Sequence, residues 1–404
     1  DTATKKKRLN IIKGRGMSSK MRCSLVLLLI FAGICCQLAL SFVHPSSSKM
    51  LLLRPSQSGI QSRSILHMSS DLEYNFDVAA WKKGFQTALE VPIKEVSVVQ
   101  GAIPEGLSGT YYRNGPGAFD EVTNAEDGDG FAAAVTFHEG AATFRARFLE
   151  SVPYMKEKAK GKRMYRGKYQ TLGGLSLPGG DLRSKNVGNR NLLYFAKRLV
   201  ALYPNGLPYK IEPLSLTLQE RTTIGDQLGD QAMFCACPKA DPVTQTLVGY
   251  ALSNDRRKVK LYEFNTKYVA AEPREEAFAG PMFCDDFALT EKFAVFFQPP
   301  VKLDGGAYGF NKKPLAEACT LDKGGKTKVY LFPRDPAGKR VELEMDPVFV
   351  DAVANAYEDR EGNIVVDLIY SEDLPWAPGT AAAPAWTRAD FSPSGGRALG
   401  RLVL

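Results

Sequence analysis

Two short segments that combine cysteines with acidic residues are the best candidates in this sequence for metal chemistry. Cys235 and Cys237 flank a single alanine, and Cys284 directly precedes Asp285. Thiolates and carboxylates both bind zinc and iron, so Cys237 and Asp285 could share a mixed site. The single residue between the two cysteines of the first pair argues against this, because zinc motifs place more residues between their ligands. We therefore favour a simpler interpretation, in which these cysteines are small, buried free thiols.

A second acidic segment, residues 127–130, has the sequence Asp-Gly-Asp-Gly and invites a calcium interpretation. An EF-hand loop would need Gly at its sixth position and Glu at its twelfth, where this chain has Ala132 and His138. The segment is better explained as a turn that enters a strand. His44, His67 and His138 are the three histidines of the chain, and a lone histidine at a polar hairpin tip, as expected for His138, is rarely a ligand or a base.

Short strands separated by turn residues dominate the chain after its first seventy residues. Apolar runs bounded by Gly, Pro, Asn and Asp are typical of such strands. The sequence predicts hairpins over residues 131–148 and 246–265, with turns at 138–140 and 254–257. It further predicts strands at 109–113, 293–297, 327–332, 364–370 and 399–404, a turn at 114–116, a loop at 377–394, and short helices at 77–89 and 190–201.

This pattern predicts an all-β fold, which could be a sandwich, a barrel or a propeller. No exact repeat is visible, but length favours the propeller, because a single sandwich rarely needs more than three hundred residues. The aromatic side chains of Phe287, Phe293, Phe296, Phe297 and Phe349 could line an apolar tunnel. We favour the alternative that they form ordinary core.

The net charge of +8 belongs to the first part of the chain. Residues 1–70 hold 11 of the 52 Lys and Arg residues and a single acid, Asp1, which leaves 41 basic against 43 acidic side chains in the remainder. A nucleic-acid partner is therefore not expected, because the folded part has no basic excess.

Residues 1–70 have the composition of a targeting leader rather than of a folded domain. Basic residues precede an apolar run at 25–40, as in a secretory signal, and the run is marginal for a membrane-spanning helix. A Ser- and Arg-rich stretch without acids follows as far as residue 70, which is typical of a transit peptide. We expect plastid import through a signal followed by this transit-like segment. Plain secretion or a signal anchor is the alternative.

Six segments of the remaining chain resemble, in the same order, sequence blocks of the carotenoid cleavage oxygenase family. The first has the sequence Ile-Pro-Glu-Gly-Leu-Ser-Gly-Thr-Tyr-Tyr-Arg-Asn-Gly-Pro, and the third contains Gly-Leu-Pro-Tyr. The blocks span residues 103–116, 127–148, 185–209, 236–242, 286–291 and 355–358. Their number, order and spread make the resemblance specific.

The resemblance implies a seven-bladed β-propeller, of which residues 71–404 would supply the N-terminal part, so we expect the natural chain to be longer. It implies Fe(II) held by four axial histidines, O₂ bound beside a hydrophobic tunnel, and oxidative cleavage of a carotenoid or apocarotenoid double bond. Glutamates that orient the histidines would complete such a site. Peripheral membrane contact is expected as well, because the substrates are lipophilic.

The positions that match the family's iron ligands hold other residues in this chain. Cys237 replaces the histidine of an Ala-His-Pro-Lys motif, and Asp285 replaces a histidine that directly precedes an Asp-Phe-Ala-Leu-Thr segment. Ala352 replaces a histidine three residues before Asn-Ala-Tyr-Glu, and the fourth ligand would lie beyond Leu404. Pro204 stands where the family has a glutamate that braces a ligand. A four-histidine centre cannot be assembled from these residues.

Three functions remain open from the sequence. The chain could be an active iron oxygenase that uses substitute ligands. It could be a non-catalytic pseudoenzyme that keeps a carotenoid-binding tunnel, or the product of a decaying gene or partial transcript. The family assignment is specific, whereas the missing histidines make cleavage by this chain doubtful.

Overall fold

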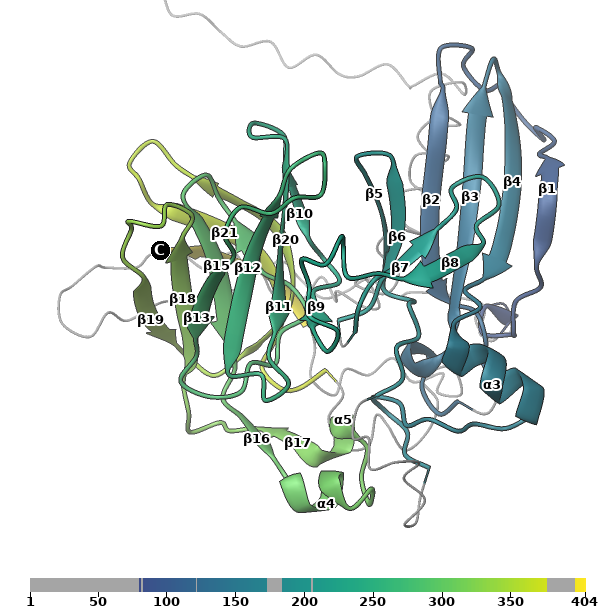
Figure 1. Ribbon diagram of the computed structural model, residues 1–404. Helices are drawn as coiled ribbons and strands as arrows, with labels where there is room; N and C mark the ends of the chain where they lie inside the picture. Colours follow the sequence, from purple (N-terminus) through teal and green to yellow (C-terminus); the bar gives the residue numbers. More distant parts are fainter. Residues whose placement is uncertain (1–79, 81–82, 121, 173–183, 205, 376–396) are drawn as a thin grey trace, which may run out of the picture.

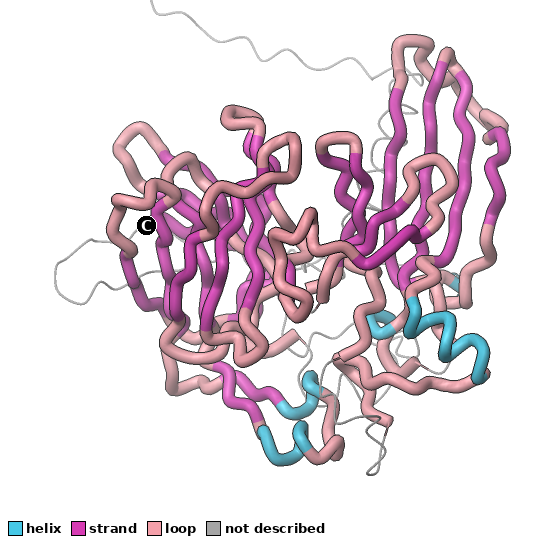
Figure 2. Tube along the Cα trace, in the orientation of Figure 1, coloured by secondary structure: helices cyan, strands magenta, loops and turns pink. Residues whose placement is uncertain are grey.

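The computed structural model describes residues 80, 83–120, 122–172, 184–204, 206–375 and 397–404. The leader at 1–70 lies outside these residues, as does the whole of the predicted loop at 377–394. Within the described parts, the chain is mostly β, with few and short helices (Figures 1 and 2).

Antiparallel sheets of about four strands follow one another in chain order (Figure 1). The first contains β1 (Val91–Glu95), β2 (Gly109–Pro116), β3 (Gly130–His138) and β4 (Ala141–Phe148), and the second contains β5 (Asn191–Phe195), β6 (Arg198–Leu202), β7 (Tyr209–Ile211) and β8 (Leu218–Arg221). The third contains β10 (Lys239–Asp241), β11 (Thr246–Leu252), β12 (Lys258–Phe264) and β13 (Arg274–Ala277), with β9 (Met233–Phe234) paired to β11. The fourth contains β14 (Ala288–Leu289), β15 (Phe293–Gln298), β18 (Thr327–Pro333) and β19 (Val341–Met345), and the fifth contains β20 (Phe349–Glu358), β21 (Ile364–Ser371) and β22 (Arg397–Val403).

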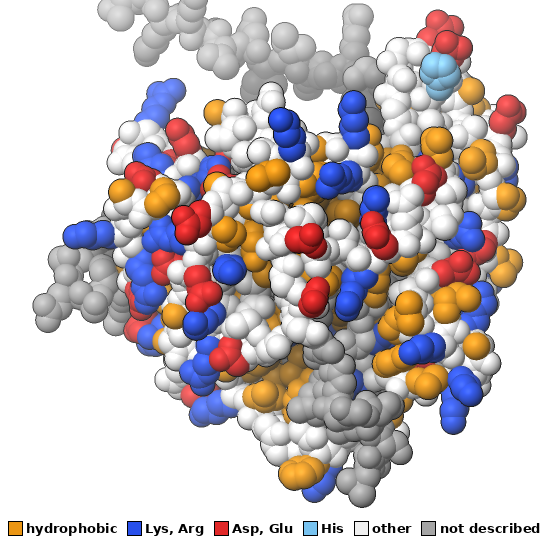
Figure 3. All heavy atoms as spheres, in the orientation of Figure 1, with side chains coloured by type: hydrophobic (Ala, Val, Ile, Leu, Met, Phe, Trp, Pro, Cys, Tyr) orange, Lys and Arg blue, Asp and Glu red, His pale blue; other side chains and the backbone are white. Residues whose placement is uncertain are grey.

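The remaining elements are short and connect or flank these sheets. They are a ribbon of β16 (Val301–Leu303) and β17 (Cys319–Leu321), a 3₁₀ turn η1 (Ala125–Asp127), and the helices α3 (Val152–Lys160), α4 (Gly305–Gly309) and α5 (Leu315–Ala318). No helix among the described residues is long and apolar enough to cross a membrane. On the face drawn in Figure 3, basic and acidic side chains are interspersed.

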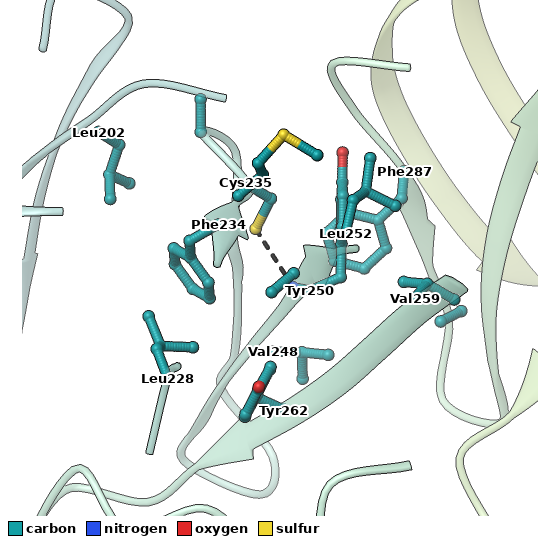
Figure 4. Packing of buried hydrophobic residues seen from close by; sticks show 14 of the residues in the cluster. Leu202, Leu228, Phe234, Cys235, Val248, Tyr250, Leu252, Val259, Tyr262 and Phe287 are labelled. Atoms are coloured by element: carbon teal, nitrogen blue, oxygen red, sulfur yellow. Dashed lines mark hydrogen bonds between the residues drawn. The ribbon is translucent and has the colours of Figure 1, made fainter. Parts of the chain in front are cut away.

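Hydrophobic clusters between successive sheets hold the fold together. One cluster joins β3 to β6 through Ala134 and Leu199, and a large one joins the second, third and fourth sheets (Figure 4). Another joins β15 to β21 through Val295 and Leu368. Because each inner sheet is covered on both faces, β11 is a continuous run of buried residues after its first position rather than an alternating one. The packing of successive sheets therefore explains the unbroken apolar runs of the sequence.

The hairpins predicted at 131–148 and 246–265 are confirmed as β3–β4 and β11–β12. The predicted helix at 190–201 is wrong, because β5 and β6 form a hairpin there. Its two turn residues, Ala196 and Lys197, have φ values of 47° and 63°, as a tight hairpin turn with a right-handed twist requires. Of the helix predicted at 77–89, residues 84–89 are turn and irregular chain.

The turn predicted at 114–116 is also wrong, since these residues continue β2. Asn114 is buried there and its side-chain amide donates to the carbonyl of Gly188 at 2.5 Å. A long-range hydrogen bond, rather than a local turn, thus explains this polar residue.

Candidate axial site

The three positions predicted from the sequence to replace iron ligands are Cys237, before β10, Asp285, before β14, and Ala352, in β20. The carboxylate of Asp286 connects the segments that carry them. Its Oδ1 lies 2.7 Å from Nζ of Lys239, two residues after Cys237. Its Oδ2 accepts a hydrogen bond from the backbone N–H of Val353 at 2.9 Å, directly after Ala352. Asp286 itself follows Asp285 and is buried. The structure therefore brings these three segments into one hydrogen-bonded network.

Two of the predicted site residues line a common small cavity. Asp285 and Pro204 lie on its wall together with charged and polar residues of other segments. Its volume is about 20 Å³, enough for a single water molecule or ion. The lining residues are Pro116, Glu126, Lys168, Asn189, Arg190, Tyr203, Pro204 and Asp285. Cys237 and Ala352 are absent from this lining, so the cavity unites only part of the predicted set.

A lysine lies between two carboxylates at this cavity. Nζ of Lys168 is 3.7 Å from Oδ2 of Asp285 and 3.9 Å from Oε2 of Glu126. The hydroxyl of Tyr169 donates to the same Glu126 oxygen at 2.9 Å. The side chains are only 13% exposed for Lys168, 24% for Asp285 and 29% for Glu126, so solvent screens the two ion pairs incompletely.

Both carboxylates are held in their charged form. Burial acts to raise the pKa of Asp285, but the cations of Lys168, Arg190 and Arg256 outweigh it and hold that pKa below its usual value. Burial likewise opposes ionisation of Glu126, and Lys168 and Arg190 again lower its pKa. The site is therefore a set of ionised side chains in which cations neutralise the carboxylates.

A second ion pair belongs to the same charged region. Nε of Arg397 in β22 donates to Oδ2 of Asp351 in β20 at 2.7 Å. The register of β20 against β21 shifts between Val350 and Ala352, so Asp351 is the extra residue of a bulge. Burial, together with the negative charges of Asp285 and Glu126, raises the pKa of Asp351 even though Arg397 acts in the opposite direction.

Asp127 positions the backbone that carries Lys168. Its two carboxylate oxygens accept hydrogen bonds from the N–H groups of Lys168 at 2.8 Å and Tyr169 at 3.0 Å. Burial raises the pKa of Asp127 to about 6. The other acid of this segment, Asp129, lies 2.7 Å from Nζ of Lys185. These contacts use the Asp-Gly-Asp-Gly acids to organise the chain itself, which agrees with the turn rather than the calcium interpretation.

Cys235, Cys237 and Cys284 are neutral thiols, because burial raises the pKa of each above its usual value. The side-chain amide of Asn191 donates to the carbonyl of Ala236 at 3.0 Å, which holds the Cys237 segment against β5. Burial raises the pKa of Cys237 to about 12. Cys235 and Cys284 are buried core residues that share Tyr250 as a neighbour. The N–H of Tyr250 donates to Sγ of Cys235 at 3.3 Å (Figure 4), and its hydroxyl lies 3.6 Å from Sγ of Cys284.

The residues present do not fit a four-histidine iron centre. Ala352 offers no ligand atom, Cys237 is a neutral thiol, and Asp285 is already paired with Lys168. Among the described residues, no group of three or more His, Cys, Asp or Glu side chains is arranged to hold a metal ion. His138, the one histidine within them, is 72% exposed at the tip of the β3–β4 hairpin, 3.5 Å from Glu139.

The aromatic residues considered for a tunnel pack as core. The rings of Phe287 and Phe296 stack with centroids 5.5 Å apart, and Tyr250 meets both edge-on. Phe297 and Phe349 are fully buried as well, and Phe293 packs from the edge of the cluster between the fourth and fifth sheets. This arrangement supports the core interpretation.

Sequence reasoning missed the charged residues that line the cavity beside Asp285. Glu126, Lys168 and Arg190 line the cavity but belong to no motif with a recognisable spacing. Glu126 directly precedes the Asp-Gly-Asp-Gly segment, which is the only local hint. They lie together because the three separate segments that carry them border the same cavity.

Comparisons with known proteins agree with this architecture. The family model described as retinal pigment epithelial membrane protein matches residues 84–394. An apocarotenoid-15,15'-oxygenase of Synechocystis is 30% identical over 321 residues, which cover 76% of this chain and 65% of that protein. An isoeugenol monooxygenase of Pseudomonas putida is 28% identical over 305 residues, covering 72% of this chain and 61% of the relative.

The solved structure of cobalt-substituted Synechocystis apocarotenoid oxygenase superposes with a TM-score of 0.74 at 29% identity, covering 81% of this chain and 70% of that one. The chain thus spans about two thirds of the length of the curated relatives that it matches. From the extent of the family match and the shared architecture, the chain belongs to the retinal pigment epithelial membrane protein family, that of the carotenoid cleavage oxygenases.

Proposed function

We propose that this chain is a non-catalytic member of the carotenoid cleavage oxygenase family that binds a carotenoid or apocarotenoid without iron-dependent cleavage. The observation that carries the proposal is the contact between Lys168 and Asp285. At a position where the resemblance implies an iron-binding imidazole, this chain has a carboxylate 3.7 Å from an ammonium group. Cys237 and Ala352 supply no substitute imidazole, so these three positions do not support Fe(II) as histidines would.

The ligand class follows from the family and not from a pocket assigned in this fold. The Synechocystis relative is named for an apocarotenoid and the Pseudomonas relative for isoeugenol. Both compounds contain a conjugated double bond. We propose that the present chain takes the longer, lipophilic type. We also propose that its sheets are blades of a seven-bladed propeller, which the likeness to the Synechocystis enzyme supports.

The proposal separates into two measurements on the purified protein. The first is iron content after anaerobic incubation with Fe(II), with Cys237→Ala as a comparison. We expect no stoichiometric iron in either protein. Iron that is bound by the original chain and lost in Cys237→Ala would reveal a substitute centre and return the oxygenase function to first place.

The second measurement is a spectral titration with an apocarotenal, with isoeugenol as the short comparison ligand. We expect a shifted polyene absorption band and quenched protein fluorescence, with the apocarotenal recovered uncleaved after exposure to O₂. If neither the polyene absorption band nor the protein fluorescence changes, carotenoid binding is contradicted and the decaying-gene explanation is left. Cleavage products would contradict the non-catalytic assignment.

Location and membrane contact remain proposals that rest on residues 1–70 and on the lipophilic ligand. We propose plastid import, with secretion as the alternative. A fluorescent fusion of residues 17–75 that stays in the endoplasmic reticulum would contradict the plastid destination. Sedimentation of the purified protein with liposomes tests the peripheral contact.

A further inference from the structure

We infer that a balanced set of charged side chains takes the structural place of a bound metal beside the small cavity at Asp285, and that Lys168 supplies its central positive charge. The set has three cations and three carboxylates. Lys168 contacts Glu126 and Asp285, Arg397 pairs with Asp351, and Arg190 lines the same small cavity as Lys168, Glu126 and Asp285. The inference concerns how the sheets are held together, so it stands whether or not the chain binds a carotenoid.

The members come from separate sheets, as metal ligands at this point would. Glu126 lies in η1, between the second and third strands of the first sheet, and Arg190 directly precedes β5 of the second sheet. Asp285 precedes β14 of the fourth sheet, and the Asp351–Arg397 pair lies within the fifth sheet. A cation that contacts Glu126 and Asp285 together therefore connects the first sheet to the fourth.

Hydrogen bonds to the backbone keep Lys168 in position between Glu126 and Asp285. Asp127 accepts hydrogen bonds from the N–H groups of Lys168 and Tyr169, which fixes the backbone. The ammonium group then reaches Asp285 at 3.7 Å and Glu126 at 3.9 Å. The cavity beside it, of about 20 Å³, leaves space for no more than about one water molecule or ion.

Charge balance explains why such a centre would exclude a divalent metal. Each carboxylate of the set already faces a cation, so the site offers no excess negative charge to a metal ion. Adding two positive charges beside Lys168 and Arg190 in this partly buried place would be opposed by repulsion that solvent screens poorly. Removing Lys168 should instead leave two cations against three carboxylates and take from Glu126 and Asp285 the ammonium group that both contact.

The first part of the test compares thermal unfolding of the full chain with that of Lys168→Met. The control is Lys302→Met, which makes the same substitution in an exposed pair whose Nζ lies 2.8 Å from Oδ2 of Asp322. We expect Lys168→Met to lower Tm by about 5 °C or more and Lys302→Met by about 1 °C or less. Equal effects of the two substitutions would overturn the inference.

The second part restores charge balance without the lysine. In the double variant Lys168→Met/Asp285→Asn, two cations and two carboxylates of the set remain, so most of the lost Tm should return. This comparison also decides the case in which Lys168→Met alone yields no folded protein. A double variant that is as unstable as Lys168→Met would overturn the inference.

The third part uses Fe(II) and Co(II), each added anaerobically to the original chain. We expect neither ion to remain after gel filtration and neither to raise Tm. An ion retained at about one per chain together with a higher Tm would show that a metal, and not Lys168, completes the axis. This readout is independent of the carotenoid titration, so the two proposals can fail separately.

Discussion

The backbone N–H of Val353 in β20 donates to Oδ2 of Asp286 at 2.9 Å, although Asp286 lies just before β14 of another sheet. The same carboxylate accepts from the N–H of Phe287 at 2.8 Å and pairs with Lys239 at 2.7 Å. Asp286 is buried, so all of these contacts form away from bulk water. One side chain therefore holds together the three segments that contain Cys237, Asp285 and Ala352, the predicted ligand positions.

Loss of this carboxylate should destabilise the fold strongly. We expect Asp286→Ala to lower the free energy of unfolding by about 2–4 kcal/mol, because it leaves a buried N–H and a lysine without their acceptor. Asp346→Ala is the control, since its partner Lys326 and Asp346 itself are 53% and 76% exposed. Thermal or urea unfolding measures both, and a cost for Asp286→Ala no larger than for the control would contradict the assigned role.

A second prediction concerns the connection between the third and fourth sheets through Arg334. Its guanidinium donates to both oxygens of Glu263, at 2.9 and 3.0 Å, and to Asp241 at 2.7 Å. Lysine keeps the charge but not the planar fork, so Arg334→Lys should cost about 1–3 kcal/mol of unfolding free energy.

The control for Arg334 has the same geometry in an exposed place. Arg401 donates to both oxygens of Asp367 at 2.7 and 3.0 Å, but it is 56% exposed. Arg401→Lys should therefore change stability by about 0.5 kcal/mol or less. If both lysine variants unfold alike, the bidentate contact of Arg334 does not hold the two sheets together.

A third prediction tests the close approach of Asp127 to the chain before Lys168. A methyl group on Gly167 would collide with the carboxylate of Asp127. Gly167→Ala should therefore displace that carboxylate from the N–H groups of Lys168 and Tyr169 and cost about 2 kcal/mol or more. Gly229→Ala is the control, because a Cβ there meets nothing within 4 Å. Differential scanning calorimetry of both variants decides whether the contact is as tight as described.

A fourth prediction follows from the pKa of Asp127, which burial raises from its ordinary value of 3.8 to about 6. Between these values the folded protein binds a proton that the unfolded chain has released. The contribution of this group to stability is therefore fully present below about pH 4 and is lost as pH rises towards 6.

The variant Asp127→Asn removes this titration while keeping the size of the side chain. We expect it to be less stable overall, since an amide can accept only one of the two backbone hydrogen bonds well. We also expect its stability to rise more steeply, or fall less, between about pH 4 and pH 6 than that of the original chain. Parallel pH profiles of the two proteins would show that Asp127 titrates normally.

The strands were predictable because their signals are local. The β3–β4 turn at Glu139 and Gly140 and the apolar run of β15 can each be recognised within a few residues. The prediction failed at residues 190–201, where an apolar segment with alanine and leucine satisfied a helical pattern as well. A turn at Ala196 and Lys197, and pairing of β6 with β7, decided that segment in favour of a hairpin.

The sequence by itself determined the family, because its six blocks follow one another in order along the chain. It also predicts Cys237, Asp285, Ala352 and Pro204 as the site positions, from the motifs beside them. Only the tertiary structure showed which charged side chains surround Asp285. Lys168 meets Asp285 across a long stretch of sequence, and no periodicity or spacing relates the two. Such a contact depends on where several sheets end in space, and electrostatic pairing of that kind leaves no pattern along a single chain.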